Sequence, residues 1–116
     1  MATADGVSAQ AWSCPSDGYI TKYDRCTKLS NGVLMVGLAD GGGTIETGYN
    51  KTGGSTVSAK LGYLRTGTNH WGASTSMAAD RTYYKLWSGV GSACSGTNGL
   101  LYSGGTTYQT PAADFC

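Results

Sequence analysis

Hydrophobic and polar residues alternate along much of this chain with a period of two. In residues 55–65 the apolar side chains fall at every second position from Val57 to Tyr63, and serine, lysine and glycine stand between them. Successive side chains of a β-strand point to opposite faces, so this run predicts a strand with one buried face. Residues 44–50 and 81–88 alternate in the same way and predict two further strands.

One run is apolar without alternation. Residues 33–39 read VLMVGLA, and an unbroken apolar run is typical of a strand that is covered on both faces. We therefore expect this strand in the centre of its sheet. Residues 18–29 are rich in Tyr, Ile and Thr and predict its hairpin partner. Asn31 and Gly32, between the two runs, predict a type I′ turn with left-handed dihedrals at both positions.

Glycine-rich turns separate the remaining runs, at residues 40–43, 53–54 and 67–69. Two shorter strands are expected over residues 100–103 and 106–110. About seven strands with a turn roughly every ten residues predict an all-β fold, either a small antiparallel β-sandwich or a barrel with meander hairpins. No helical period runs along the chain, although residues 74–80 could form a single helical turn.

The start of the chain differs from the rest. Residues 1–13 are small, polar and aperiodic apart from Trp12. Burial of so little apolar surface cannot offset the entropy cost of ordering the backbone, which is about 1 to 2 kcal/mol per residue. We therefore expect a flexible N-terminal arm over residues 1–13 and a single domain over residues 14–116. Deletion of residues 1–12 is expected to leave the melting temperature almost unchanged.

Composition and charge narrow the range of functions. The chain has 116 residues, of which 19 are glycine and 2 are proline, and its formal net charge is +1. Charged residues make up 13% of the chain and form neither a basic stripe for nucleic acid nor an acidic tract for cations. No apolar run reaches the roughly 18 residues that a spanning helix needs. The sequence thus predicts no nucleic-acid partner and no membrane span.

The four cysteines, Cys14, Cys26, Cys94 and Cys116, are the strongest chemical signal. An even number of cysteines in a short chain favours disulfide bonds formed in an oxidising compartment. Structural zinc sites use closely spaced cysteine pairs, which this chain lacks, so we expect no metal. Four cysteines allow three pairings. We favour Cys14 with Cys26 and Cys94 with Cys116, because both bonds close short loops, and keep a bond between Cys26 and Cys94 as the alternative.

Disulfides in so short a chain predict a secreted, extracellular protein. Residues 1–4 have neither the basic start nor the apolar core of a signal peptide, so secretion is expected to use a leader that this sequence does not contain. Asn50, Lys51 and Thr52 form a glycosylation sequon, which matters only in a eukaryotic secretory pathway.

Candidate catalytic residues are few. His70 is the only histidine, and its position at a turn beside Trp71 favours a packing role over a catalytic one. A pair of carboxylates across a cleft is the other option, but several aspartates stand at turns, where they usually bond to the backbone. Asp40, followed by three glycines, lacks the alternating ligands of a calcium loop. We therefore expect no enzymatic activity and no cofactor. The carboxylates are Asp5, Asp17, Asp24, Asp40, Glu46, Asp80 and Asp114.

Tyrosine and tryptophan supply nearly all the aromatic rings, with 8 Tyr and 3 Trp against 1 Phe. Such rings suit protein interfaces and sugar stacking, because they combine an apolar face with a hydrogen-bonding group. A carbohydrate-binding module, one alternative function, would need coplanar rings on an open face, and Tyr63, Tyr83 and Trp87 are the candidates. A secreted inhibitor of a hydrolase, the other alternative, would need a rigid exposed loop such as residues 14–26 or 94–116.

Three stretches carry a resemblance to a known family. They are residues 26–32 (CTKLSNG), residues 48–55 (GYNKTGGS) and the YQTP of residues 108–111 before a terminal cysteine. In pattern the chain resembles small secreted proteins of filamentous actinobacteria, and among these it most resembles the adaptor subunit of umbrella toxin particles. The resemblance covers most of residues 14–116.

This resemblance implies a function without catalysis. A small disulfide-bonded β domain would bind a repeat-bearing toxin, and its extended N-terminal arm would insert into a cleft of a lectin-bearing subunit. The arm contacts would then be Val7, Ala9, Ala11 and Trp12. We therefore expect a secreted, non-enzymatic protein-binding module, an adaptor that joins subunits of an extracellular antibacterial toxin complex.

Overall fold

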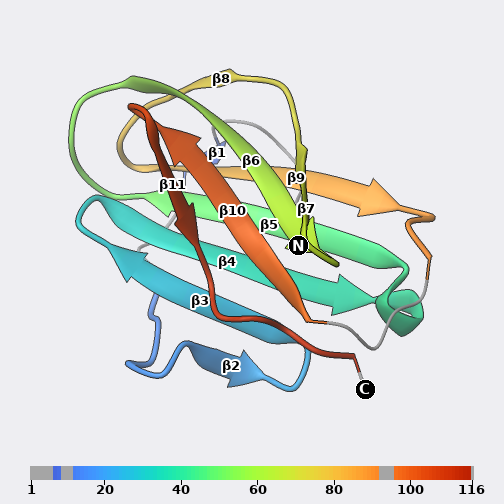
Figure 1. Cartoon of the computed structure of the whole chain (residues 1–116). Helices are drawn as coiled ribbons and strands as arrows, with labels where there is room; N and C mark the ends of the chain where they lie inside the picture. Colours follow the sequence, from blue (N-terminus) through green and yellow to red (C-terminus); the bar gives the residue numbers. More distant parts are fainter. Residues whose placement is uncertain (1–6, 9–11, 92–95, 116) are drawn as a thin grey trace.

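The computed structural model describes residues 7–8, 12–91 and 96–115 (Figure 1). These residues form strands, connected by turns and one short 3-10 turn, η1 (Asp40–Gly42). The strands are β1 (Val7–Ser8), β2 (Tyr19–Thr21), β3 (Asp24–Leu29), β4 (Gly32–Ala39), β5 (Thr44–Lys51), β6 (Val57–Arg65), β7 (Thr68–Trp71), β8 (Thr75–Met77), β9 (Arg81–Ser88), β10 (Thr97–Ser103) and β11 (Thr106–Gln109).

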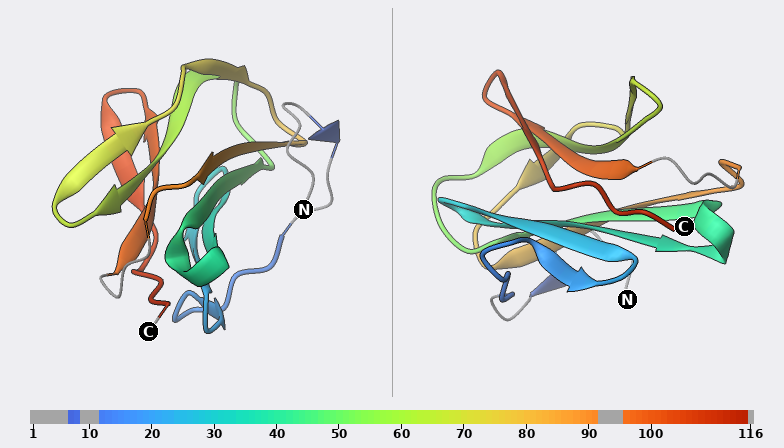
Figure 2. Two further views of the ribbon diagram at one scale, coloured as in Figure 1. Left: turned by 90° about the vertical axis from the view of Figure 1, so that its right-hand side faces the viewer. Right: turned by 60° about the horizontal axis from the view of Figure 1, so that its bottom comes forward.

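The strands build two antiparallel sheets. The six-stranded sheet has the order β1-β9-β5-β4-β3-β2, and the five-stranded sheet has the order β11-β10-β6-β7, with β8 also paired to β6. The two sheets stack as layers, as the two views of Figure 2 show. The predicted all-β antiparallel fold is confirmed, and of the two expected architectures the protein adopts the sandwich.

The core lies between the inner faces of the two sheets. Leu34 and Val36 of β4 are completely buried, and Ala59, Leu61 and Tyr63 of β6 face them with exposed fractions of 5% or less. Two apolar clusters share this interior, one around Leu34 and Leu61 and one around Val36 and Tyr63. The predicted central position of residues 33–39 and the predicted buried face of residues 55–65 are thus confirmed.

The predicted type I′ turn at Asn31 and Gly32 is wrong. Leu29 pairs with Gly32, so the loop consists of residues 30–31, and neither Asn31 nor Gly32 has a positive φ. Gly32 is needed for another reason, since a Cβ atom there would overlap the carbonyl oxygen of Asn50. Left-handed pairs occur instead at Thr66 and Gly67, where φ is 52° and 78°, and at Gly104 and Gly105, where φ is 60° and 82°.

The helical turn predicted for residues 74–80 is also wrong. Thr75–Met77 forms β8, which pairs with the part of β6 that β7 leaves unpaired, through Val57 with Met77 and Ala59 with Thr75. Met77 is 1% exposed and belongs to the core. Burial of this side chain against β6 and the open edge of that strand together outweigh the local helical tendency.

One of the two predicted disulfides lies among the described residues. Cys14 and Cys26 are bonded, with 5.9 Å between their Cα atoms. Cys94 and Cys116 lie outside the described residues, so a bond between them stays a prediction. Within residues 7–8, 12–91 and 96–115, no helix is long and apolar enough to cross a membrane.

The described part of the predicted arm lies along the domain. Val7 and Ser8 form β1, which pairs with Thr82 and Arg81 of β9. Trp12 is half-buried. The rest of residues 1–13 except Ser13 lie outside the described residues, including Ala9 and Ala11, and the flexibility of the arm stays a prediction.

Candidate functional site

Trp12 and Ser13, just before the disulfide between Cys14 and Cys26, lie on the outer face of the six-stranded sheet. The backbone N–H of Trp12 donates a hydrogen bond of 2.9 Å to Oδ1 of Asn50. The indole ring lies 6.0 Å from the ring of Tyr84. It also lies over Gly48, because a methyl group added there would be 3.1 Å from Cη2 of Trp12. Two residues later, Cys14 fastens the segment to β3 through its disulfide with Cys26.

Trp12 helps to form a shallow apolar pocket of about 250 Å³ on this face. Its lining consists of Trp12, Ser13, Ile20, Val33, Met35 and Tyr84. Ile20 beside the pocket is 40% exposed, and Leu86, on the same side of β9 as Tyr84, is 45% exposed. We call the surface of Trp12, Ile20, Met35, Tyr84 and Leu86 the arm face. Exposed apolar side chains in one patch are typical of an interaction surface.

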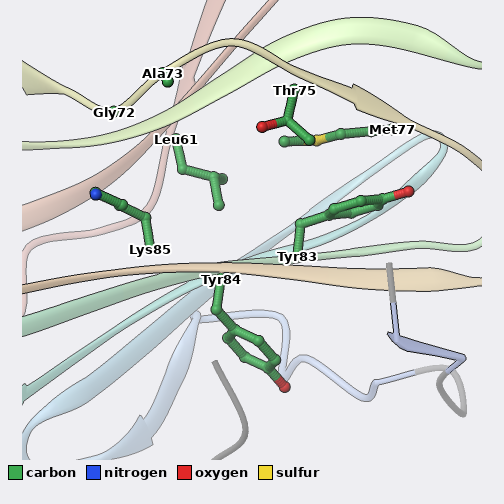
Figure 3. A pocket seen from close by; sticks show the side chains of 8 residues that line it. All are labelled: Leu61, Gly72, Ala73, Thr75, Met77, Tyr83, Tyr84 and Lys85. Carbon is green, nitrogen blue, oxygen red and sulfur yellow. The ribbon is translucent and has the colours of Figure 1, made fainter. Parts of the chain in front are cut away.

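A second pocket, of about 150 Å³, lies on the other side of β9, where the edges of the two sheets face each other (Figure 3). We call it the edge cleft. Leu61, Met77 and Tyr83 point into it, while Tyr84 points away from it on the opposite side of β9. The hydroxyl of Tyr83 accepts a hydrogen bond of 2.8 Å from the backbone N–H of Ala78, which holds the turn before β9 in place. The remaining lining residues are Gly72, Ala73, Thr75 and Lys85.

Strand β9 therefore runs between two pockets, one on each of its faces. β9 pairs with β5 along its whole length, over residues 81–88, but with β1 only at Arg81 and Thr82. Among the described residues, the edge of β9 over residues 83–88 has no partner strand. An edge of this kind presents backbone N–H and C=O groups that can pair with an added strand.

One carboxylate belongs to this region. Burial raises the pKa of Glu46 on β5 above its ordinary value of 4.5. Burial also raises the pKa of the Tyr84 hydroxyl, and the negative charge of Glu46 adds to that effect. The arm face therefore lies beside a carboxyl group that holds its proton more tightly than an exposed one.

The rings proposed for sugar stacking do not form an open platform. Tyr63 and Tyr83 are 5% and 4% exposed and belong to the core between the sheets. Trp87 is half-buried and meets Tyr63 edge to face at 4.9 Å. His70 stacks on Tyr63 at 4.5 Å, in agreement with its expected packing role. The structure thus brings Tyr63 and Trp87 together, but inside the sandwich.

The other candidate residues have structural partners. Asp17 accepts a hydrogen bond of 3.0 Å from the backbone of Tyr19, and Asp40 accepts one of 2.7 Å from the Thr44 hydroxyl, as expected for aspartates at turns. Within the described part of the chain, no three His, Cys, Asp or Glu side chains gather as a metal site would require. Asn50 of the sequon is completely buried, and its amide donates to the Thr82 hydroxyl, so it offers no glycosylation site.

Sequence reasoning missed one cluster. Lys60, Trp71 and Tyr102 come together on the outer face of the five-stranded sheet. Alternation in residues 55–65 placed Lys60 on the polar face of its strand. It does not show which strands pair with β6, and Trp71 and Tyr102 come from those neighbouring strands.

Comparisons of the chain with protein-family models, with curated proteins and with solved structures found no match.

Proposed function

We propose that the protein is a secreted, non-enzymatic module that binds other proteins, and that it serves as an adaptor joining subunits of an extracellular antibacterial toxin complex. The observation that carries this proposal is the open edge of β9 between two pockets. The disulfide between Cys14 and Cys26 and the lack of a spanning helix among the described residues are compatible with an extracellular location.

The geometry suits the addition of a strand. An extended segment of a partner that pairs with residues 83–88 would gain main-chain hydrogen bonds, and its successive side chains would point to opposite faces. One set would enter the edge cleft beside Tyr83, and the other would reach the arm face beside Tyr84. Pockets for alternate side chains are what gives this mode of binding its specificity.

The arm supplies a second binding element. The described pairing of β1 covers Val7 and Ser8 only, and a ladder this short is held by few hydrogen bonds, each worth about 1 kcal/mol. Val7 can therefore leave β9 at small cost and pair with a partner, while the disulfide at Cys14 keeps the arm attached to the domain. An adaptor needs two such separate contacts, one on the arm and one on the domain.

The inhibitor alternative also has an observation in its favour. The segment closed by the disulfide carries Tyr19 and Ile20, which are 49% and 40% exposed on β2. The guanidinium of Arg25 lies 4.3 Å from the Tyr19 ring centroid and supports that side chain. A short, stapled strand with exposed apolar side chains would fit the substrate cleft of a hydrolase.

The test is capture of partners by the purified protein from a culture supernatant of an actinobacterium that produces it. We expect a repeat-bearing toxin and a lectin-bearing subunit, identified by mass spectrometry. Leu86→Arg places a charge on the exposed arm face and should abolish capture of the partner that binds the domain. Tyr108→Arg is the matched control, because Tyr108 is similarly exposed (37%) but lies on the other sheet.

Three outcomes would overturn the proposal. Capture of a lone hydrolase would favour the inhibitor alternative. Equal capture by Leu86→Arg and by the unaltered protein would exclude the arm face. Failure to capture any protein would exclude an adaptor.

A further inference from the structure

The outer face of the five-stranded sheet carries the cluster that the sequence did not reveal. Pairing of Gly62 with Trp71, and of Lys60 with Tyr102, puts the three large side chains on one side of the sheet. This side faces away from the core, because Leu61 and Tyr63, the alternate residues of β6, are buried between the sheets.

Trp71 is the base of the cluster. A Cβ atom at Gly62 would lie 2.6 Å from Cε3 and 3.1 Å from Cδ2 of the indole, so the ring lies directly against the backbone of β6. Tyr102, which is 39% exposed, meets Trp71 edge to face with 6.1 Å between ring centroids and an interplanar angle of 72°. One ring thus lies close to the sheet and the other stands across it.

Lys60 lies between the two rings. Its ammonium nitrogen is 5.2 Å from the centroid of Trp71 and 5.2 Å from that of Tyr102. Contacts of a cation with two ring faces hold the side chain in one position. We call the surface formed by Lys60, Trp71 and Tyr102 the ring face.

The residues around the ring face are neutral. By register, the same side of the sheet carries the amides of Asn69, Asn98 and Gln109 and the hydroxyls of Ser58 and Thr107. None of the strands β6, β7, β8, β10 and β11 contains an aspartate or a glutamate. The charge of Lys60 is therefore not balanced by a carboxylate of its own sheet.

We infer that the ring face binds an acidic saccharide, one that contains uronic acid residues. The apolar face of a pyranose ring stacks on an exposed aromatic ring, and Tyr102 offers that surface, with the half-buried Trp71 as the base beside it. The amides and hydroxyls bond to sugar hydroxyls, and Lys60 bonds to the carboxylate. A polyanion bound through its phosphates would call for several cations, and among the described residues the strands of this sheet place one, Lys60, on this side.

This inference goes beyond the proposed function. The ring face lies on the opposite sheet from the arm face, so a saccharide and a protein partner can be bound at the same time. Such a site would place the protein on an acidic cell-surface polysaccharide.

The test uses a short oligogalacturonate as the acidic probe and a cello-oligosaccharide as the neutral one, with binding measured by isothermal titration calorimetry on the full chain. We expect the acidic probe to bind and the neutral probe to bind at least about tenfold more weakly. Affinity for the acidic probe should fall with added salt, because the Lys60 contact is exposed and screened.

Two variants and a control locate the site. Tyr102→Ala should weaken binding at least about tenfold, a typical loss for an aromatic ring at the centre of a contact. Lys60→Met keeps the aliphatic stem and should remove the preference for the acidic probe. Tyr108→Ala is the control, because Tyr108 pairs with Leu101 and faces the other side of the sheet. Circular dichroism spectra should confirm that all three variants are folded.

Three results would overturn the inference. The first is that neither probe binds the unaltered protein. The second is that Tyr102→Ala and Tyr108→Ala bind the acidic probe equally well. Equal binding of the two probes by the unaltered protein would exclude the acidic class.

Discussion

On each outer face of the sandwich a tryptophan ring lies over a glycine, but the two rings are held in place differently. On the six-stranded sheet Trp12 lies over Gly48 of β5, and on the five-stranded sheet Trp71 lies over Gly62 of β6. Trp12 comes from a segment outside the sheet and is held by one backbone hydrogen bond and the neighbouring disulfide. Trp71 belongs to a strand of the sheet it covers. The first ring can therefore be displaced with its segment, whereas the second is fixed by the strand register.

The disulfide explains how a short segment stays on the arm face. Ordering a free chain costs about 1 to 2 kcal/mol per residue. Because Cys14 is bonded to Cys26, only one residue separates Trp12 from a fixed point. The free energy gained by burying the indole then offsets the entropy cost of ordering that short stretch. Trp12 therefore stays on the arm face, where Ile20 and Leu86 remain exposed.

The largest effect should come from breaking the disulfide. Cys14→Ala with Cys26→Ala removes a bond that closes a loop with a sequence separation of 12, and should lower the free energy of unfolding by about 3 kcal/mol. The tryptophan emission of the protein, to which Trp12 contributes with Trp71 and Trp87, should also shift to longer wavelength as Trp12 leaves the sheet. Denaturant unfolding measures the first effect. An unchanged free energy of unfolding would contradict this account of the arm face.

Alanine at the two glycines beneath the tryptophans should separate the two faces. A Cβ at Gly62 would overlap the backbone carbonyl oxygen of His70 as well as Trp71, and a backbone atom cannot move aside without strain. Gly62→Ala should therefore destabilise the protein by about 2 to 3 kcal/mol.

At Gly48 the nearest atoms belong to the side chains of Tyr84, at 3.0 Å, and Trp12, at 3.1 Å. Both can shift, so Gly48→Ala should cost less than about 1 kcal/mol, mostly through loss of Trp12 contacts. Thermal unfolding of both variants tests the comparison. An equal cost at the two positions would show that Trp12 is as firmly fixed as Trp71.

Removal of parts of the arm tests how much of it matters for stability. Deletion of residues 1–12 removes the Trp12 ring and should cost about 1 to 2 kcal/mol, below the value for a fully buried tryptophan because Trp12 is half-buried. This replaces the expectation from sequence that the deletion is neutral. Deletion of residues 1–8 removes the short pairing of β1 but keeps Trp12, and should cost less than about 1 kcal/mol. Similar melting temperatures for the two deletions would contradict the role given to Trp12.

Local patterns predicted the strands well. Burial of one face of a strand produces alternation, as in residues 55–65 and 81–88, and burial of both faces produces an apolar run, as in residues 33–39. Both patterns lie within the residues of a single strand, so the sequence shows them directly. The turn at Asn31 and Gly32 was mispredicted, because Gly32 is required by a close approach and not by a turn. A side chain at position 32 would overlap the carbonyl oxygen of Asn50 on the neighbouring strand.

The sites could not be predicted in the same way. Alternation shows that Tyr63 and Trp87 each face one side of a strand, but not that these sides form the core. The meeting of Lys60, Trp71 and Tyr102 depends on the order β10-β6-β7 and on the register of both pairings. Both are long-range properties, and no local pattern in the sequence specifies them.

The smallest effect concerns the charge of Glu46 beside the arm face. The strands of the five-stranded sheet contain no carboxylate of this kind. Burial raises the pKa of Glu46 above 4.5, so the folded protein holds this proton more tightly than the unfolded chain does. A carboxyl with a raised pKa lowers stability as the pH rises from its unfolded pKa through its folded pKa. Glu46→Gln removes that loss. At about pH 7 the variant should therefore unfold at a higher urea concentration than the unaltered protein. At about pH 3, where Glu46 is protonated in both the folded and the unfolded protein, the two should unfold at nearly the same concentration. A difference of equal size at both pH values would mean that the substitution acts through packing and not through the charge of Glu46.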